Sequence, residues 1–406
     1  MKTLKKIFIL FVLFFIYSYI ISIDNIPTNI TVFKGQNIKL NTLWGVNIKT
    51  KNDSVETLSN IDETAFEEPG KQVLTVSLLD KIALKSITVS VIDEIDVIPI
   101  GEVAGIKLYT NGILVVGTSQ IEDIDGNIQK PYEKTDIKEG DSITAINDCI
   151  VNSTEELLKI VNESEGRKIK IKYSRNNEQK ECEIQPVKDK DNNYKLGLWV
   201  RDSAAGVGTM TFYNEQTGSF AGLGHAITDI DTGEIINTSS GEIDDVSILS
   251  IVKGKREAPG KIQGTIKQNS IIGSIYKNTK YGIYGVIKNP MNLEVDYTRK
   301  MKVASRQETK LGNAKILSDI DGSIKEYDIE IQKVYLNNYY DNKSMLIKVT
   351  DENLIKKTGG IIQGMSGSPI IQDGKFIGAV THVFVNDPQI GYAVFGETMI
   401  QQLSEM

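Results

Sequence analysis

Near its C-terminal end the chain reads Gly359-Gly360-Ile361-Ile362-Gln363-Gly364-Met365-Ser366-Gly367-Ser368-Pro369, with a serine between two glycines. Glycines lack the Cβ atom that would block an approaching carbonyl, and they allow the sharp turn that aims two N–H groups at an oxyanion. Ser366 therefore has the surroundings of a nucleophile, and the N–H groups of Gly364 and Ser366 would form its oxyanion hole. Because a Gly-Ser turn between strands is often only a turn, this hypothesis needs a base elsewhere in the chain.

The chain has only two histidines, so an imidazole-based mechanism must use His225 or His382. His225 lies in the glycine-rich turn Gly222–Thr228, where small neighbours leave room for an imidazole to meet a hydroxyl. We expect Ser366 to attack a peptide carbonyl while His225 takes its proton and hands it to the leaving amine. His382 lies on an alternating strand after the serine, which favours a place in the substrate cleft and makes it the reserve base.

Two aspartates between the base and the nucleophile are candidates for the acid of a catalytic triad. Asp245 opens a strand pattern in the same half of the segment as His225. Asp351 begins the segment that leads to Ser366. Both residues fit the chain order of a chymotrypsin-like triad, in which the acid lies between the base and the nucleophile. Placement in the same half of the segment as His225 favours Asp245.

Composition and charge exclude several kinds of site. The 406 residues carry a formal charge of -7 and a pI near 5.2, so no basic face is available for nucleic acid. Cys149 and Cys182 are the only cysteines, which rules out a disulfide scaffold. The sequence has no His-Glu-x-x-His motif and no cysteine cluster, so we expect neither a metal nor a cofactor.

The N-terminal segment predicts a membrane helix. Lys2, Lys5 and Lys6 precede an almost wholly apolar run, Ile7–Ile23, which is just long enough to cross a bilayer core of about 30 Å. A cleaved signal peptide would need a small-x-small site, which this run does not offer. We therefore expect residues 1–24 to be an uncleaved signal-anchor, with the lysines in the cytoplasm and the body of the protein outside it.

Residues 25–95 predict a small β domain. Apolar and polar residues alternate in four stretches: Asn29–Phe33, Asn37–Leu40, Gln72–Leu79 and Ile87–Ile92. Such alternation is typical of a half-buried antiparallel sheet. We find no catalytic motif in this segment and interpret it as a spacer or docking module.

In residues 96–200, the run Lys138–Asn147 reads Lys-x-Gly-Asp-x-Ile-x-x-Ile-Asn and is followed by a Ser/Thr-capped helical pattern. With these features the segment resembles a PDZ domain of bacterial peptidases. Such a module offers a groove between a strand and that helix, in which a peptide adds as an extra strand. We expect the loop around Gly101, Gly105 and Ile106 to hold the terminal carboxylate of the peptide.

Residues 201–406 consist of many short strand patterns with Gly, Asn and Asp turns, which suit one closed antiparallel barrel or a pair. The loop Gly364–Pro369 is close to the Gly-Asp-Ser-Gly-Gly-Pro loop of chymotrypsin-like serine peptidases, with Met365 and Ser368 replacing the Asp and the second Gly. The expected fold is therefore mainly β with a small α/β module. It comprises a membrane helix, a small β domain, a PDZ domain and a chymotrypsin-like double β-barrel.

Three stretches together resemble the SpoIVB family of serine peptidases: Arg201–Tyr213, Gly222–Asp231 and Thr358–Pro388. The resemblance assigns the nucleophile and the base to Ser366 and His225, in agreement with the residues themselves. It assigns the acid to Asp351 rather than Asp245, and this conflict stays open.

The resemblance also implies a biological role. A peptidase of this kind is secreted by the forespore into the space between two membranes, cleaves itself, and then cleaves an inhibitory membrane partner. This releases an intramembrane protease that matures a sporulation sigma factor. Two rival functions remain: a non-catalytic docking protein built on the PDZ groove and barrel, and an envelope quality-control serine protease.

Overall fold

The structure is a computed structural model that describes residues 2–24, 26–38, 46–50, 66–79, 81–176, 178–290, 293, 295–336 and 342–404. Helix α1 (Lys2–Asp24) occupies the segment of the predicted signal-anchor. Over these described ranges, no helix combines the length and the apolar character needed to span a membrane.

A four-stranded sheet follows α1, in the order β1-β4-β3-β2. Its strands are β1 (Asn29–Phe33), β2 (Val46–Thr50), β3 (Gly70–Leu78) and β4 (Ile82–Ile92). Strand β1 pairs with β4 in parallel and the other pairs are antiparallel, so the purely antiparallel sheet predicted for residues 25–95 is corrected to a mixed one. Of the predicted strand 37–40, residues 37 and 38 lie in no strand and residues 39 and 40 lie outside the described residues.

The first barrel is a ring of strands paired in the order β6-β17-β18-β19-β16-β15 and back to β6. The strands are β6 (Val103–Thr118), β15 (Leu198–Asn214), β16 (Ser219–Gly222), β17 (Thr238–Val252), β18 (Lys261–Thr279) and β19 (Gly282–Ile287). Short strands β5 (Asp96–Pro99) and β20 (Met301–Lys302) extend this sheet beyond β15, and the one-turn helix η4 (Tyr297–Arg299) precedes β20. Inward-facing apolar side chains such as Met210, Phe220 and Ile275 fill the ring.

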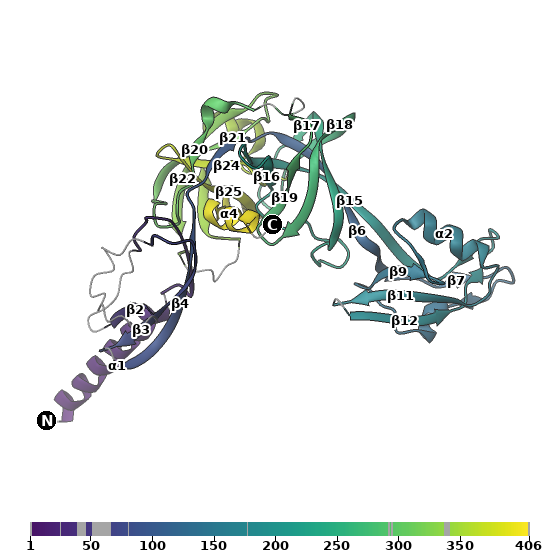
Figure 1. The fold of residues 1–406 in the computed structure, drawn as a ribbon, viewed down its shortest axis with the longest axis horizontal. Helices are drawn as coiled ribbons and strands as arrows, with labels where there is room; N and C mark the ends of the chain where they lie inside the picture. Colours follow the sequence, from purple (N-terminus) through teal and green to yellow (C-terminus); the bar gives the residue numbers. More distant parts are fainter. Residues whose placement is uncertain are drawn as a thin grey trace.

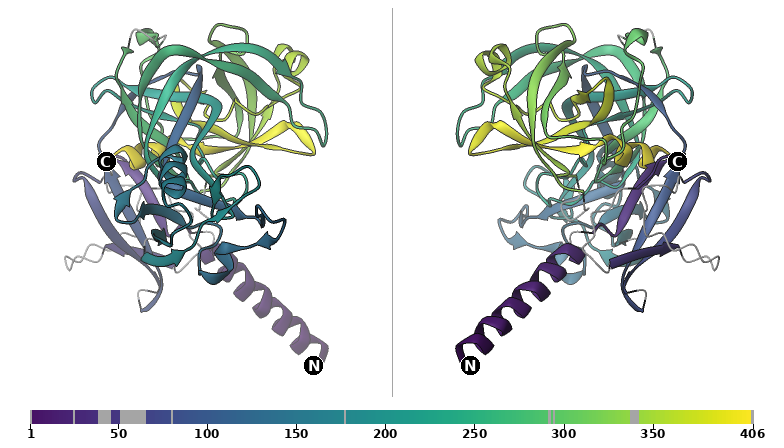
Figure 2. Two further views of the ribbon diagram at one scale, coloured as in Figure 1. Left: turned by 90° about the vertical axis from the view of Figure 1, so that its right-hand side faces the viewer. Right: turned by 90° about the vertical axis from the view of Figure 1, so that its left-hand side faces the viewer.

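The second barrel is closed in the order β21-β22-β23-β26-β25-β24, beside the first (Figure 2). Its strands are β21 (Gly312–Ser318), β22 (Lys325–Val334), β23 (Met345–Val349), β24 (Pro369–Gln372), β25 (Lys375–Phe384) and β26 (Asp387–Phe395). Helix α3 (Glu352–Thr358) precedes the nucleophile loop, and α4 (Gly396–Ser404) ends the described chain. The expected pair of barrels is present.

An α/β module is inserted between β6 and β15, which leave the first barrel together as a long ribbon (Figure 1). Its main elements are β9 (Ser142–Ile146), β10 (Cys149–Ile150), α2 (Thr154–Glu163), β11 (Ile169–Arg175) and β12 (Glu178–Ile184). Around them lie β7 (Ile121–Glu122), β8 (Ile128–Gln129), η2 (Pro131–Lys134), β13 (Val187–Lys188) and β14 (Tyr194–Lys195). The predicted capped helix is confirmed as α2, where the Ser153 hydroxyl accepts a hydrogen bond from the Glu156 N–H at 3.2 Å.

The module begins later in the chain than the predicted start of the PDZ segment at residue 96. The first part of β6 pairs with β17 of the barrel, and only its later part, at Ile113 and Leu114, pairs with β9 of the module. Residues 96–110 therefore belong to the first barrel, and the prediction that places them in the PDZ segment is corrected. The sequence conceals this boundary because one strand, β6, runs through it; Gly112 has a left-handed conformation (φ 81°), and the register with β15 shifts between Arg201 and Ser203.

A buried ion pair ties α4 to the segment that enters the second barrel. The guanidinium of Arg306 bonds the carboxylate of Glu397, and the Arg306 N–H donates to the same carboxylate at 2.7 Å. Their side chains are 3% and 0% exposed. Glu397→Ala should therefore lower the free energy of unfolding by about 3–5 kcal/mol, because it leaves a buried guanidinium unpaired. Chemical denaturation measures this loss.

The matched control is Lys310→Ala, which removes one partner of the exposed Lys310–Asp373 pair. Exposed pairs contribute little to stability, so this variant should unfold at nearly the same denaturant concentration as the unaltered chain. Equal losses in both variants would contradict a structural role for the Arg306–Glu397 pair.

Candidate active site

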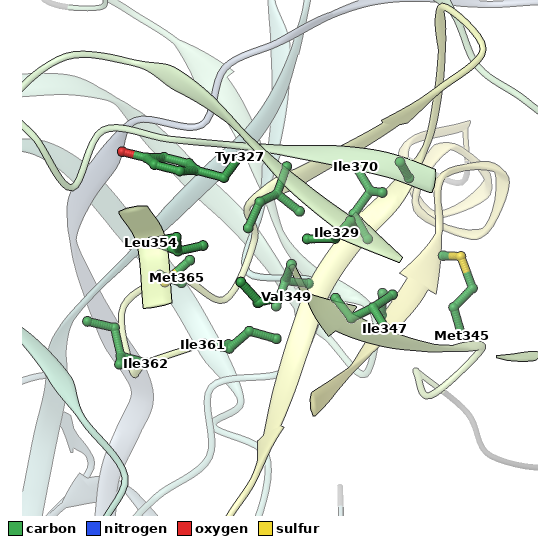
Figure 3. Packing of buried hydrophobic residues seen from close by; sticks show 14 of the residues in the cluster. Tyr327, Ile329, Met345, Ile347, Val349, Leu354, Ile361, Ile362, Met365 and Ile370 are labelled. Carbon is green, nitrogen blue, oxygen red and sulfur yellow. The ribbon is translucent and has the colours of Figure 1, made fainter. Parts of the chain in front are cut away.

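The nucleophile loop is held by apolar side chains that point into the second barrel. Ile361, Ile362 and Met365 are buried in its core, together with residues of β22 and β23 (Figure 3). Met365 is 0% exposed and occupies the position at which the chymotrypsin-like loop has an aspartate. While these side chains are buried in the barrel, Ser366 lies at the surface of a cavity.

The backbone of this loop leaves two N–H groups available. The N–H groups of Met365 and Gly367 donate to carbonyl oxygens at 3.0 and 2.8 Å, whereas those of Gly364 and Ser366 have no hydrogen-bond partner within the described part of the chain. This alternation is the arrangement that an oxyanion hole requires. Gly367 has a φ of 98°, and a Cβ there would collide with the carbonyl oxygen of Thr209.

Thr209 of β15 fixes the loop from the first barrel. Its N–H donates to the Ser366 carbonyl at 3.0 Å, and its hydroxyl donates to the Gly364 carbonyl at 2.7 Å. The Thr209 carbonyl in turn accepts the N–H of Leu223 at 3.2 Å. The bonds to the Gly364 and Ser366 carbonyls orient the peptide groups that adjoin the two free N–H groups. The sequence analysis did not identify Thr209, because no local pattern marks a single threonine for this role.

Ser366, His225 and His382 line one cavity of about 990 Å³ between the barrels. His225 follows β16 of the first barrel, and His382 lies on β25 of the second. Apolar side chains form much of the wall, among them Ile227 and Val383. The structure therefore brings together the predicted nucleophile, the predicted base and the reserve base.

A backbone carbonyl sets the tautomer of His225. Its Nδ1 lies 2.7 Å from the Ala226 carbonyl oxygen, and because a carbonyl can only accept, Nδ1 carries the proton. Nε2 then has the lone pair that a general base needs. Burial lowers the pKa of His225 below its usual 6.5, so the imidazole is neutral and able to accept a proton at neutral pH.

The hydroxyl of Ser366 is not yet directed at a base. It donates to the carbonyl oxygen of Thr381 at 2.8 Å. Attack on a substrate requires rotation of this side chain away from Thr381 and toward His225. Catalytic hydrogen bonds often form only when substrate is bound.

His382 forms a second neutral imidazole in the cavity. Its ring centroid lies 5.2 Å from that of His225, with the planes tilted by 38°. Burial, together with His225 and Lys343, lowers the pKa of His382 to about 4. Its Nδ1 is buried and has no hydrogen-bond partner among the described residues. Such a pKa makes His382 a weak base.

Neither candidate acid contacts His225. The Asp351 carboxylate accepts the Leu354 N–H at 2.9 Å and caps helix α3, while Asp245 pairs with Lys267 at 2.6 Å. Across the described residues, no carboxylate is recorded beside the His225 ring. The structure thus places Asp351 as a helix cap and not beside His225, and the Asp before an apolar helical pattern could have indicated this cap.

The residues expected to hold a peptide carboxylate lie in the first barrel instead of the α/β module. The Gly101 N–H donates to Met210 of β15 at 2.9 Å. Gly105 lies within β6, and Ile106 is buried in the barrel core. This prediction is corrected because Gly105 and Ile106 lie in strand β6 and Gly101 lies in the short connection that joins β5 to β6.

Comparisons with known proteins agree with the resemblances predicted from the sequence. The profile of the SpoIVB peptidase S55 family matches residues 192–400, and that of the PDZ domain matches residues 116–185. The solved Rv3671c protease from M. tuberculosis, in its active form, is 12% identical over 50% of this chain and 74% of that chain, with a TM-score of 0.29. The PDZ domain of an SdrC-like protein from Listeria monocytogenes is 21% identical over 22% of this chain and 87% of that chain, with a TM-score of 0.18.

The cap assignment of Asp351 predicts different effects for two substitutions. Asp351→Asn keeps a capping oxygen and should retain both stability and the reactivity of Ser366 toward a fluorophosphonate. Asp351→Ala should lower the free energy of unfolding by about 0.5–2 kcal/mol. A loss of reactivity near 10⁴-fold in Asp351→Asn, about the effect of removing a triad acid, would contradict the assignment.

Proposed function

Since the chain belongs to the SpoIVB peptidase S55 family, we propose that this serine peptidase cleaves itself and then an inhibitory membrane partner. The profile match to the peptidase family covers more than half of the chain. In this proposal the second cleavage releases an intramembrane protease that matures a sigma factor during sporulation. The family resemblance supports this role.

The chemistry follows from the residues that line the cavity. Ser366 Oγ attacks the peptide carbonyl while Nε2 of His225 accepts its proton, and the N–H groups of Gly364 and Ser366 bind the oxyanion. The imidazolium then gives the proton to the leaving amine, and water hydrolyses the acyl-enzyme by the same route. The two unpartnered N–H groups at the nucleophile, in one cavity with His225, are the observation that carries the assignment.

The cellular location is part of the proposal. A membrane tether at residues 1–24, with the body in the space between the forespore membranes, is what the family resemblance and the basic, apolar N-terminal sequence support. The PDZ module would bind peptide segments of the substrate or of the chain itself, by adding them as a strand.

Ser366→Ala should abolish both self-cleavage of the purified chain and its labelling by a fluorophosphonate, because no alkoxide can form. The matched control is Ser368→Ala. The Ser368 hydroxyl is buried and has no partner in the described part of the chain, so its removal should leave labelling in place. Mass spectrometry of the labelled peptide locates the adduct. An adduct elsewhere than Ser366, or processing by Ser366→Ala at the normal rate, would refute the assignment.

The pH dependence follows from the lowered pKa of His225. Only the neutral imidazole can accept the serine proton, and burial keeps it neutral below its usual pKa of 6.5. The acid limb of kcat/KM should therefore have its midpoint below pH 6.5, so that more than half of the maximal activity is retained at pH 6.5. Initial rates of peptide cleavage across this range measure the midpoint. A midpoint at or above pH 7 would be inconsistent with the environment of His225.

A further inference from the structure

Strand β15 has one edge with no strand partner along much of its length. From Leu198 to Thr209 it pairs with β6 on one side. On the other side its pairing with β16 begins only at Met210. Over the residues that the structure describes, no strand covers this second edge between Leu198 and Gly208. An open edge presents a row of backbone donors and acceptors to any extended chain that reaches it.

The direction of the backbone groups on this edge follows from the ladder. The N–H and carbonyl of Met210 bond toward Glu102 and Gly101, whereas those of Thr209 bond to the opposite side. Pairing with β6 is regular from Ser203 to Thr209, and the direction alternates with every residue. Ser203, Ala205 and Val207 therefore direct their N–H and carbonyl groups at the open edge, and no bond to them is recorded within the described residues.

This open edge lies in the catalytic cavity. All residues from Ser203 to Val207 line it, together with Ser366. The next outward-facing residue, Thr209, bonds directly to the Ser366 carbonyl. Five residues of strand span roughly 16 Å, so a polypeptide paired along this edge would end next to the nucleophile.

Side chains on and around the edge favour an extended polypeptide with apolar residues. The strand itself carries small residues here, Ser-Ala-Ala-Gly at positions 203–206, and positions 205 and 206 are exposed. Other residues that line the cavity are apolar and exposed, among them Ile230, which is 86% exposed, and Val385, which is 55% exposed. Alternate side chains of an added strand could pack on these residues.

The same strand begins in the PDZ module. Residues 198–201 of β15 pair with β6 inside the module, and helix α2 lies against this part of β15. The Asp202 carboxylate accepts the Thr154 N–H at the start of α2, at 2.7 Å. One strand edge thus runs from the side of α2 to the nucleophile (Figure 1).

We propose that the open edge of β15 at residues 203–207 binds the substrate as an added β-strand, in the form of an extended polypeptide with apolar side chains at alternate positions. The inference rests on the proposed peptidase function and deepens it, because it assigns a backbone-directed substrate site that leads from the PDZ module into the catalytic cavity. Recognition of backbone rather than particular side chains fits a site that must accept both the chain itself and a partner.

The test measures binding without catalysis. The full chain carrying Ser366→Ala is titrated into a fluorescein-labelled peptide of about twelve residues, with alternating valine and serine and an amidated C-terminus that cannot use a carboxylate site. Fluorescence anisotropy gives the affinity. A set of peptides, each methylated at one backbone nitrogen, then reports which N–H groups are bonded.

Methylation should weaken binding by roughly threefold to tenfold at every second nitrogen and have little effect at the others, since each bonded N–H contributes one hydrogen bond. Ala205→Pro in the Ser366→Ala chain removes one donor of the edge and should weaken binding of the unmethylated peptide by a similar factor. Glu178→Pro is the control, because this residue starts the far edge strand β12, where proline is tolerated, and binding should be unchanged.

Absence of binding, equal losses at all nitrogens, or unchanged affinity in a folded Ala205→Pro chain would overturn the proposal. The methyl scan needs no variant of β15, so it decides the question even if Ala205→Pro fails to fold. Failure of the peptidase function would instead show as a lack of fluorophosphonate labelling at Ser366 in the unaltered chain, with binding in the Ser366→Ala chain unaffected.

Discussion

The two hydrogen bonds from Thr209 are the constraint on which the active site depends. Residues of the nucleophile loop belong to the second barrel, and His225 belongs to the first, so catalysis needs a fixed relation between the barrels. Thr209 supplies it by donating to the carbonyls of both Gly364 and Ser366. Each bond fixes a peptide group next to an N–H group that would face an oxyanion. The interface between the barrels is thus itself part of the site.

The strand that carries Thr209 also fixes the position of the PDZ module. Strand β15 carries Thr209 near one end and enters the module at the other. A module attached through a flexible linker would have no fixed orientation, but this one is attached through a paired two-stranded ribbon. Its position relative to the cavity is therefore set by the two stretches of pairing between β6 and β15, at Leu198–Arg201 in the module and at Ser203–Thr209 in the barrel (Figure 1).

Local patterns in the sequence predicted the parts of this protein that are encoded locally. The glycines around Ser366, the isolated His225 and the capped helix α2 each follow from neighbours in the chain, and the structure has them in those forms. What the sequence did not predict depends on pairing between distant segments. The assignment of residues 96–110 to the barrel, the parallel pairing of β1 with β4, and the contact of Thr209 with the loop all join residues that no local pattern connects. The sequence does not distinguish the cap at Asp351 from a triad acid, because both positions demand the same residue type.

The surroundings of His225 show how the site can function without a carboxylate at the imidazole. In a triad the carboxylate orients the ring, selects the tautomer and stabilises the imidazolium. The Ala226 carbonyl performs the first two tasks through its bond to Nδ1, but as a dipole it stabilises positive charge less than a full negative charge would. Burial lowers the pKa of His225, and the bond to the Ala226 carbonyl, which acts in the opposite direction, does not offset it. The His225 imidazole therefore binds a proton less tightly than the histidine of a triad. For the same reason it stays unprotonated at mildly acidic pH. More of the stabilisation of the transition state then falls on the N–H groups of Gly364 and Ser366, which explains why the loop that holds them is fixed from both barrels.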